Sequence, residues 1–311
     1  MRNISLVILF FLSYSCTSMS QERRDSVINT SDSISCQKDS IITSRLTLLF
    51  AGDLMQHQAQ INAARTSTGY DYSDCFKFVK EEINRADIAI ANLEVTLGGK
   101  PYRGYPAFSA PDEYLFAIRD AGFDVLITAN NHCLDKGKKG LERTLLMLDS
   151  LQIPHAGTYV NTESREQQYP LLLEKNGFRI ALLNYTYGTN GIKVISPNVV
   201  NYIDKAVMAQ DIEAARAQHP DALIACMHWG DEYQSLPNKE QKNLTDWLLQ
   251  QGVTHIIGSH PHVVQPMELR TDSITGNQHV VVYSLGNFIS NMSARHTDGG
   301  LLFKLELEKD S

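Results

Sequence analysis

The sequence predicts an α/β domain built on a mostly parallel sheet, and three patterns lead to this prediction. Apolar runs of strand length alternate with amphipathic stretches of helical length along the chain. The dipeptide Asn176-Gly177 between two apolar runs is a hairpin signal. The last strand-like runs follow one another without helices between them. The alternation favours a parallel sheet covered by helices, and the other two patterns add an antiparallel part. One mixed sheet, or two stacked sheets with outer helices, satisfies all three.

Apolar periodicity and helix-stopping residues place the individual elements. Gly122 and Gly252 end two predicted helices, and Pro220 follows a third. Phe76 and Ile83 lie on one face of another predicted helix. Strands are expected at residues 46–51, 87–91, 124–129, 171–174, 178–184, 222–227, 255–257, 263–268, 280–284 and 301–306. Helices are expected at residues 73–85, 113–121, 139–151, 205–218 and 239–251.

The N-terminus has the pattern of a bacterial export signal. Arg2 precedes an apolar run at residues 4–12, which is too short to span a bilayer as a helix. Small residues and then Cys16 follow, as in a lipobox, although Ser13 stands where Leu is usual. We therefore interpret residues 1–16 as a lipoprotein signal peptide that ends in an acylated Cys16. An ordinary cleaved signal is the alternative.

The rest of the chain divides into a tether and one domain. Residues 17–44 are rich in Ser, Thr, Asp and Gln and lack an apolar period, which predicts a flexible tether. Residues 45–311 contain all the predicted elements and form the expected domain. This organisation predicts a protein of the bacterial cell envelope, anchored by lipid to a membrane, with its domain in the periplasm or outside the cell.

Composition narrows the class of protein. The chain of 311 residues is 43% hydrophobic and 20% charged, which is typical of a globular protein, and its net charge is −7. Nucleic-acid binding requires a basic face, so we expect no nucleic-acid partner. The cysteines Cys36, Cys75, Cys133 and Cys226 fit no zinc motif. Buried free thiols are expected for Cys75 and Cys226.

Polar clusters follow five of the predicted strands. In open α/β sheets, ligands bind at the carboxyl ends of the strands, so we expect these clusters to converge on one site. The five clusters are Gly52-Asp53-Leu54-Met55, Asn92-Leu93-Glu94, Asn130-Asn131-His132-Cys133-Leu134-Asp135, His228-Trp229-Gly230-Asp231-Glu232 and Gly258-Ser259-His260-Pro261-His262.

The side chains in these clusters are typical metal ligands. Two carboxylates, four imidazoles and a carboxamide suit one or two divalent ions such as Mn, Zn or Fe. Two ions about 3.5–4 Å apart can hold an ester oxygen and activate water together. Glu94 or Asp53 would bridge such a pair, and His132 would face the substrate as a proton donor or oxyanion contact. His57, Asp135 and Glu232 are candidates for orienting the ligands.

Each cluster alone has a structural explanation. Gly-Asp is common in turns, Asn130 and Asn131 can shape a turn, and His228 can be a core histidine. Five such coincidences at equivalent positions favour a site. Cys133 beside His132 suggests a thiol nucleophile, but nothing around it indicates a lowered pKa. The sequence contains no Gly-x-Ser-x-Gly elbow, phosphate-binding Gly-rich loop or dinucleotide fingerprint.

Six motifs in order give the chain a resemblance to a known family. They are Gly-Asp-Leu-Met, Asn-Leu-Glu, Ala-Asn-Asn-His-x-x-Asp-x-Gly, His-Trp-Gly-x-Glu-Tyr, Gly-Ser-His-Pro-His-Val-Val-Gln-Pro and Tyr-Ser-Leu-Gly-Asn-Phe. Over residues 46–306 the chain resembles the CapA family, the poly-γ-glutamate capsule synthesis proteins. That family is similar to calcineurin-like metallophosphoesterases. The resemblance implies a four-layer α/β/β/α sandwich.

The resemblance also implies roles for individual residues. It implies Asp53 and Glu94 as metal carboxylates, with Glu94 near the bridging position, and His132 as the catalytic acid. Met55 replaces an expected imidazole, so a one-metal centre is also consistent with the sequence. The implied metal ligands are Asp53, Glu94, Asn131, His228, His260 and His262. Further contacts to ligands or substrate are expected from Asn92, Asp135, Glu232 and Asn287.

The expected function is metal-dependent phosphoester hydrolysis in the synthesis or processing of an anionic envelope polymer. Arg103 and Arg119 are candidate contacts to an anionic substrate. Expected partners are an anionic polymer or phosphoester substrate, the membrane and capsule synthase components. A non-catalytic polymer-binding or assembly lipoprotein is one alternative. A metal-dependent amide hydrolase acting on γ-glutamyl bonds is the other.

Overall fold

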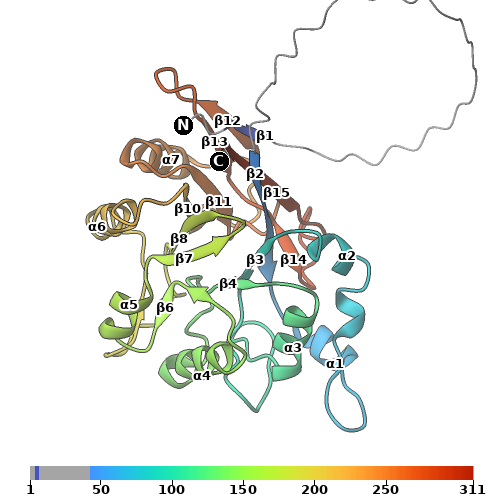
Figure 1. The fold of residues 1–311 in the computed structure, drawn as a ribbon. Coiled ribbons are helices and arrows are strands. Elements are labelled where there is room, and N and C mark those ends of the chain that lie inside the picture. Colours follow the sequence, from blue (N-terminus) through green and yellow to red (C-terminus); the bar gives the residue numbers. More distant parts are fainter. Residues whose placement is uncertain (1–3, 7–42, 311) are drawn as a thin grey trace, which may run out of the picture.

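Two β-sheets stack face to face, and helices cover both outer faces (Figure 1). This computed structural model describes residues 4–6 and 43–310. The predicted lipidation site Cys16, as well as Cys36 and most of the predicted signal and tether, lie outside these residues. The four layers confirm the expected α/β/β/α sandwich.

The first sheet joins strands from both ends of the chain. Its strands are β1 (Ile4–Leu6), β2 (Thr43–Leu54), β3 (Ile88–Leu93), β4 (Val125–Ile127), β5 (His155–Ala156), β14 (Asn287–Ile289) and β15 (Leu302–Asp310). Their order is β1-β15-β2-β3-β4-β5, with β14 beside β2. Strands β2 to β5 run parallel, whereas β15 runs antiparallel to β2. The parallel strands bring their carboxyl ends to one edge.

The second sheet has the same mixed character. Its strands are β7 (Leu171–Lys175), β8 (Phe178–Thr186), β10 (Ala222–His228), β11 (His255–Ser259), β12 (Met267–Thr271) and β13 (Gln278–Val282). Their order is β12-β13-β11-β10-β8-β7, and the four central strands are parallel. The predicted hairpin is the antiparallel pair β7–β8, where Asn176 and Gly177 have φ values of 51° and 79°. A small separate sheet pairs β6 (Thr158–Tyr159) with β9 (Val199–Val200).

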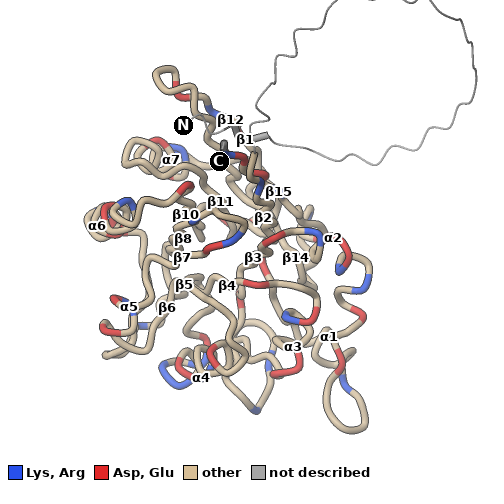
Figure 2. The backbone as a smooth tube through the Cα atoms, in the orientation of Figure 1, with Lys and Arg blue, Asp and Glu red and all other residues tan. Residues whose placement is uncertain are grey.

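Alternating side chains along the strands separate the layers. Leu48 of β2 and Ile224 of β10 face each other's sheet in the central core. Leu49 faces the first group of helices, and Ala225 faces the second. The first group is α2 (Lys80–Ile83), α3 (Asp112–Asp120) and α4 (Gly137–Ser150), and the second is α6 (Lys205–Arg216) and α7 (Lys239–Gln251). Figure 2 shows charged residues mainly on these outer helices and on loops.

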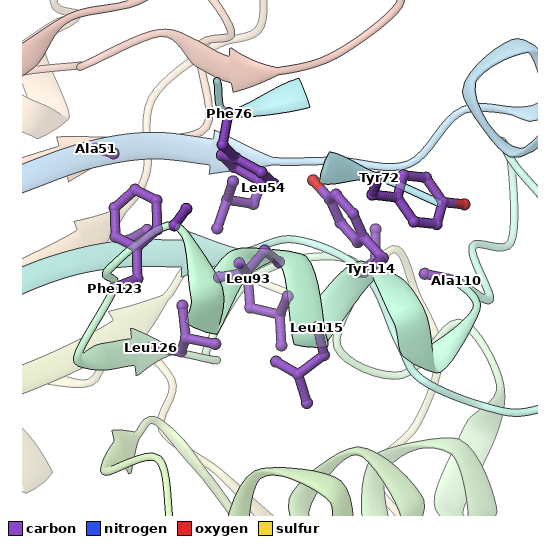
Figure 3. Close-up of a cluster of buried hydrophobic side chains, with 14 of the residues drawn as sticks. Ala51, Leu54, Tyr72, Phe76, Leu93, Ala110, Tyr114, Leu115, Phe123 and Leu126 are labelled. Carbon is purple, nitrogen blue, oxygen red and sulfur yellow. The ribbon is translucent and has the colours of Figure 1, made fainter. Parts of the chain in front are cut away.

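The first outer layer is anchored by α3. Tyr114 and Leu115 point from α3 toward Leu54 and Leu93 at the ends of β2 and β3 (Figure 3). The Tyr114 hydroxyl donates a hydrogen bond of 3.0 Å to the carbonyl oxygen of Met55. This contact fixes the chain two residues beyond Asp53, so the helix layer supports the polar end of β2.

Several predicted elements differ from the observed ones. The helix predicted at residues 73–85 is a 3-10 turn, Ser73–Cys75, followed by α2, although Phe76 and Ile83 are buried as expected. Backbone bonds from Val79 and Lys80 to Phe76 make turns in between. The strand predicted at residues 263–268 starts later, at Met267. The sequence did not predict α1 (Gln58–Ala63), α5 (Thr162–Gln168) or the short strands β1, β5, β6, β9 and β14.

The two cysteines expected to be buried differ in exposure, and the described helices lack the features of a membrane-spanning helix. Cys226 is buried as predicted, but Cys75 is exposed because it lies on the outward side of the 3-10 turn, so that expectation was wrong. Among the described helices, none combines the length and the apolar stretch needed to cross a membrane.

Candidate metal centre

The end of β2 places the first carboxylate. Asp53 pairs in register with Asn92 of β3 on one side and Asn287 of β14 on the other. The Asp53 amide donates a hydrogen bond of 3.1 Å to the carbonyl oxygen of Gly286. A Cβ atom on Gly52 would overlap that same oxygen, so only glycine permits this approach of β14. The close approach brings Asn287 beside Asp53.

Asn92 holds the two carboxylates next to each other. Its Nδ2 donates to Asp53 Oδ1 at 2.8 Å and to Glu94 Oε2 at 3.1 Å. Its Oδ1 accepts a bond of 3.1 Å from Asn130 Nδ2. Asp53 and Glu94 are fully buried. Two buried carboxylates in contact require a positive charge between them, or a proton, to be stable.

Three histidines from the second sheet complete the cluster. His262 places Nδ1 at 3.1 Å from Asp53 Oδ2 and at 3.0 Å from Asn287 Oδ1, so this nitrogen carries the proton. His228 places Nε2 at 2.8 Å from Asn131 Oδ1 and at 3.7 Å from Glu94 Oε1. His262 Nε2 lies at 3.8 Å from the same Glu94 oxygen.

These side chains form two candidate ligand sets that share Glu94. One set is Glu94, His260 and His262, and the other is Asp53, Glu94 and His228. In each set the ligand atoms lie within 4.8 Å of one another. Glu94 Oε1 and His260 Nδ1 are buried without a hydrogen-bond partner among the described residues. Buried polar atoms are normally satisfied, so a divalent cation fits this cluster.

The electrostatics of the cluster also favour a cation. Burial, and then the charge of Asp53, raise the pKa of Glu94 well above its usual range. Burial also acts to raise the pKa of Asp53, but the hydrogen bond and charge of His262 outweigh it and lower this pKa. Burial and the charge of His262 lower the pKa of His260 to about 3. A neutral imidazole has a free lone pair for a metal ion.

The backbone near the histidines adopts unusual conformations. His260 and His262 have φ values of 98° and 59°, and Tyr233 has a φ of 65°. The Tyr233 amide donates a hydrogen bond of 2.8 Å to the carbonyl oxygen of Pro261, which ties the two loops together. Residues other than glycine rarely adopt positive φ, and such strain concentrates at functional sites.

His132 lies at the edge of the cluster and has its own partner. Its Nδ1 is 2.7 Å from Asp135 Oδ2, and the same carboxylate oxygen accepts a 2.7 Å bond from the Phe108 amide. The Phe108 ring packs edge-on against the imidazole, with centroids 4.6 Å apart. The His132 amide donates to Asn130 Oδ1 at 3.1 Å. These contacts fix the ring and leave Nε2 as its free nitrogen.

The structure brings together the six predicted metal ligands, and Asn92, Asp135 and Asn287 contact the cluster as described. Glu232 is exposed on the loop after β10, where its charge contributes to the raised pKa of Glu94. Met55 is buried in the hydrophobic cluster beneath α3. Arg119 pairs with Asp120 on the exposed side of α3, so it is not placed as an anion contact.

Two aromatic residues at the cluster were not singled out by the sequence analysis. The ring centroid of Tyr187 lies 4.4 Å from that of His260, and the centroid of Tyr233 lies 6.2 Å from that of His262. Tyr187 directly follows β8, a sixth parallel strand whose carboxyl end lies beside that of β10. Its position directly after a buried parallel strand is the signal that could have identified it.

Comparisons with known proteins agree with these observations. The family model described as bacterial capsule synthesis protein PGA_cap matches residues 47–292. Capsule biosynthesis protein CapA of Bacillus anthracis is 26% identical over 279 residues, which cover 85% of this chain and 64% of that protein. PGA biosynthesis protein CapA of Bacillus subtilis (strain 168) is 29% identical over 275 residues, 85% of this chain and 68% of that protein. This chain thus matches about two thirds of the length of each relative.

A solved structure with a related arrangement is the NAD nucleotidase of Haemophilus influenzae. Its TM-score is 0.48 at 14% sequence identity, and the match covers 78% of this chain and 50% of that one.

Proposed function

Since this chain belongs to the bacterial capsule synthesis protein family PGA_cap, we propose that it is a metal-dependent hydrolase that cleaves a phosphoester during the synthesis or processing of an anionic capsule polymer. The observation that carries the proposal is the pair of ligand sets joined at Glu94, with Glu94 Oε1 and His260 Nδ1 buried and unpartnered within the described residues. Each of these atoms destabilises the fold unless a ligand satisfies it, which supports a metal ion bound at this cluster.

The residues of the cluster divide into ligands and supports. Asp53, Glu94, His228, His260 and His262 would hold one or two divalent ions, and Asn131 Oδ1 lies within reach of the same region beside His228. Bound there, a divalent ion supplies a Lewis acid and lowers the pKa of a coordinated water. Asn92 and Asn287 keep the ligands in place through the hydrogen bonds described above.

His132 is the residue proposed to move a proton. Its Nδ1 faces Asp135, so Nε2 is the atom that would give a proton to a departing alkoxide oxygen. Asp135 orients the ring and, being also bonded to the Phe108 amide, is itself fixed. His132 and Asp135 are arranged like the histidine and the orienting carboxylate of other hydrolytic sites.

We place the protein in the cell envelope, with Cys16 as its lipid anchor and the domain outside the cytoplasm. The capsule-related names of the relatives support an envelope role. An anionic polymer or a phosphoester precursor is the proposed substrate, and capsule synthase components are the proposed partners. Incorporation of radiolabelled palmitate during expression in a bacterium tests the anchor. The unmodified chain should be labelled and the Cys16→Ala variant should not, and equal labelling of the two would contradict an anchor at Cys16.

Metal content and turnover of the full chain test the hydrolase. We expect one or two Mn, Zn or Fe ions per chain by elemental analysis, and cleavage of bis(4-nitrophenyl) phosphate that a chelator abolishes. Glu94→Gln keeps the shape of the side chain but removes the shared charge, so it should lose both metal and turnover. Glu163→Gln, on the exposed side of α5, is the matched control and should keep both.

The alternatives give different results in the same assay. Cleavage of a γ-glutamyl anilide without cleavage of the phosphodiester would indicate an amide hydrolase. Full metal occupancy without turnover on either substrate, or no metal after incubation with Mn²⁺ and Zn²⁺, would contradict the proposed hydrolase.

A further inference from the structure

Two half-exposed tyrosines lie beside the metal centre. Tyr187 and Tyr233 are 48% and 44% exposed, yet their rings lie close to His260 and His262, at the centroid distances given above. Each ring therefore borders the ligand cluster and also meets solvent. Tyrosine in such a position offers a rigid aromatic surface to a bound molecule.

Backbone hydrogen bonds fix the main chain at both tyrosines. The Tyr187 amide donates to the carbonyl oxygen of His228 at 3.0 Å, and the Tyr233 amide donates to that of Pro261 at 2.8 Å. Both bonds join a tyrosine to a segment that carries a histidine of the centre. The backbone that carries each ring is thus tied to the centre.

We call Tyr187, Glu232 and Tyr233 the rim of the centre, and Glu232 gives the rim a negative charge. Glu232 precedes Tyr233 and is exposed, and within the described residues it forms no ion pair with a lysine or arginine. Glu232 lies between His228 and Tyr233 in the loop that follows β10, so the segment that carries the Tyr233 ring also carries this charge. The backbone bond from Tyr187 to His228 brings Tyr187 to the start of the same segment. The buried carboxylate of Asp53, by contrast, has His262 Nδ1 at 3.1 Å.

We propose that Tyr187, Glu232 and Tyr233 form a subsite for a positively charged ammonium group of the substrate. Aromatic faces attract cations, and a nearby carboxylate strengthens the attraction. A group with a second negative charge at this position would instead be repelled by Glu232. The inference rests on the proposed function, because the metal centre would take the anionic part of the same molecule. The substrate class is then an anionic ester that carries an ammonium group close to the reacting bond.

Matched pairs of cationic and neutral probes test the subsite on the full chain. Choline and 3,3-dimethylbutan-1-ol have the same shape and differ in charge, and ethanolammonium and propan-1-ol form a second pair. Saturation-transfer NMR titrations give the affinity of each. We expect at least one cation to bind about threefold or more tightly than its neutral partner.

Variants assign the preference to the rim. Glu232→Gln should remove it, and so should the double substitution Tyr187→Leu/Tyr233→Leu. Tyr187→Phe/Tyr233→Phe keeps the aromatic faces and should retain it, which also controls for folding. Glu163→Gln removes an exposed carboxylate elsewhere and should leave the preference unchanged.

The outcomes separate this inference from the proposed hydrolase. Equal binding within both pairs, no binding of either cation up to about 400 mM (roughly the weakest affinity that one such contact gives), or tighter binding of methyl glucoside than of both cations would overturn the ammonium subsite. Metal content measured on the same sample reports on the hydrolase. Metal without a cation preference would leave the hydrolase standing and remove the subsite, whereas a cation preference without metal would do the reverse.

Discussion

At the scale of single residues, Asn92 has the most connected position in the centre. It donates to both carboxylates and accepts from Asn130, so three strand ends depend on one amide. We predict that Asn92→Ala lowers metal affinity about 10–100-fold, because Asp53 and Glu94 lose the group that fixes their spacing. Competition with a chromogenic chelator measures this change.

The Asn92 experiment needs a control for general effects of losing an amide. Asn243→Ala, on an exposed position of α7, should leave the affinity unchanged. If Asn92→Ala binds metal as tightly as the unmodified protein, the carboxylates are held in place by other contacts and the support role of Asn92 is wrong.

Most residues of the centre could be predicted from the sequence because parallel strands end at one edge. Asp53, Glu94 and His228 each terminate an apolar strand, and that position alone brought them together in the prediction. The packing role of Met55, which stands where a ligating histidine was expected, could not be predicted in the same way. The side chain takes part in the core beneath α3, and only the packing of α3 against β2 reveals that.

At the scale of elements, the end of α7 gives a direct test of backbone conformation. Gly252 has a φ of 101°, and its amide donates to the carbonyl oxygen of Leu249 at 3.0 Å. A side chain is disfavoured in this conformation, so Gly252→Ala should lower the free energy of unfolding by about 1 kcal/mol. Urea denaturation of the full chain measures the difference.

A second glycine provides the comparison. A Cβ atom on Gly188 would meet no other atom within 4 Å, and the φ of this residue is not positive. Gly188→Ala should therefore change the stability by a few tenths of a kcal/mol in either direction. Equal losses in the two variants would show that the conformation of Gly252 is not the cause.

The start of β11 contains a buried histidine that makes stability depend on pH. His255 Nδ1 accepts a hydrogen bond of 3.1 Å from the Val280 amide, and burial, helped by the charge of His279, lowers the pKa of His255 to about 3. The unfolded chain binds this proton near pH 6.5, whereas the folded chain resists it. Stability from this residue is therefore present above pH 6.5 and is lost as the pH falls toward 3.

The contribution of His255 follows from comparing pH slopes. As the pH falls below 6.5, the resistance of folded His255 to protonation should lower the free energy of unfolding by up to about 1.4 kcal/mol per pH unit. His255→Asn keeps an acceptor for the Val280 amide and has no proton to gain, so its slope should be shallower than that of the unmodified protein. Unfolding measured in urea between pH 7 and 4.5 gives both slopes, and identical slopes would contradict the assignment.

Elements were predictable where local signals are strong. The glycine after α7 marks the end of that helix, and Asn-Gly marks the turn between β7 and β8. Few residues other than Gly and Asn adopt the left-handed conformation that these two positions require, so both boundaries could be predicted closely. Helix α5 escaped prediction because none of its residues is buried, so it has no apolar stripe. The segment at residues 73–85 kept its buried residues but not its regular helix, since turns around Phe76 satisfy the same packing.

At the scale of the whole molecule, the centre lies where the two sheets meet. Asp53 and Glu94 belong to the first sheet, and His228, His260 and His262 belong to the second or the loop after it. The residue patterns predicted a mixed sheet or two stacked sheets and did not decide between them. The choice depends on the inward faces of β2 and β10, which can be recognised only once the sheets are paired.

A metal ion bound in this position would join the two sheets, so it should stabilise the entire fold. The stabilisation grows with the logarithm of one plus the ratio of free metal to the dissociation constant, and it reaches about 2.7 kcal/mol at a ratio of about a hundred. We therefore expect the Tm of the chelator-treated full chain to rise progressively with added Mn²⁺ or Zn²⁺. Glu94→Gln should show no such rise, because Glu94 belongs to both ligand sets.

An equal rise in that variant would mean that metal binds elsewhere on the folded chain, and a fall in both would indicate preferential binding to the unfolded state. A rise in the unmodified protein alone would tie the stability of the sandwich to the cluster that joins its sheets.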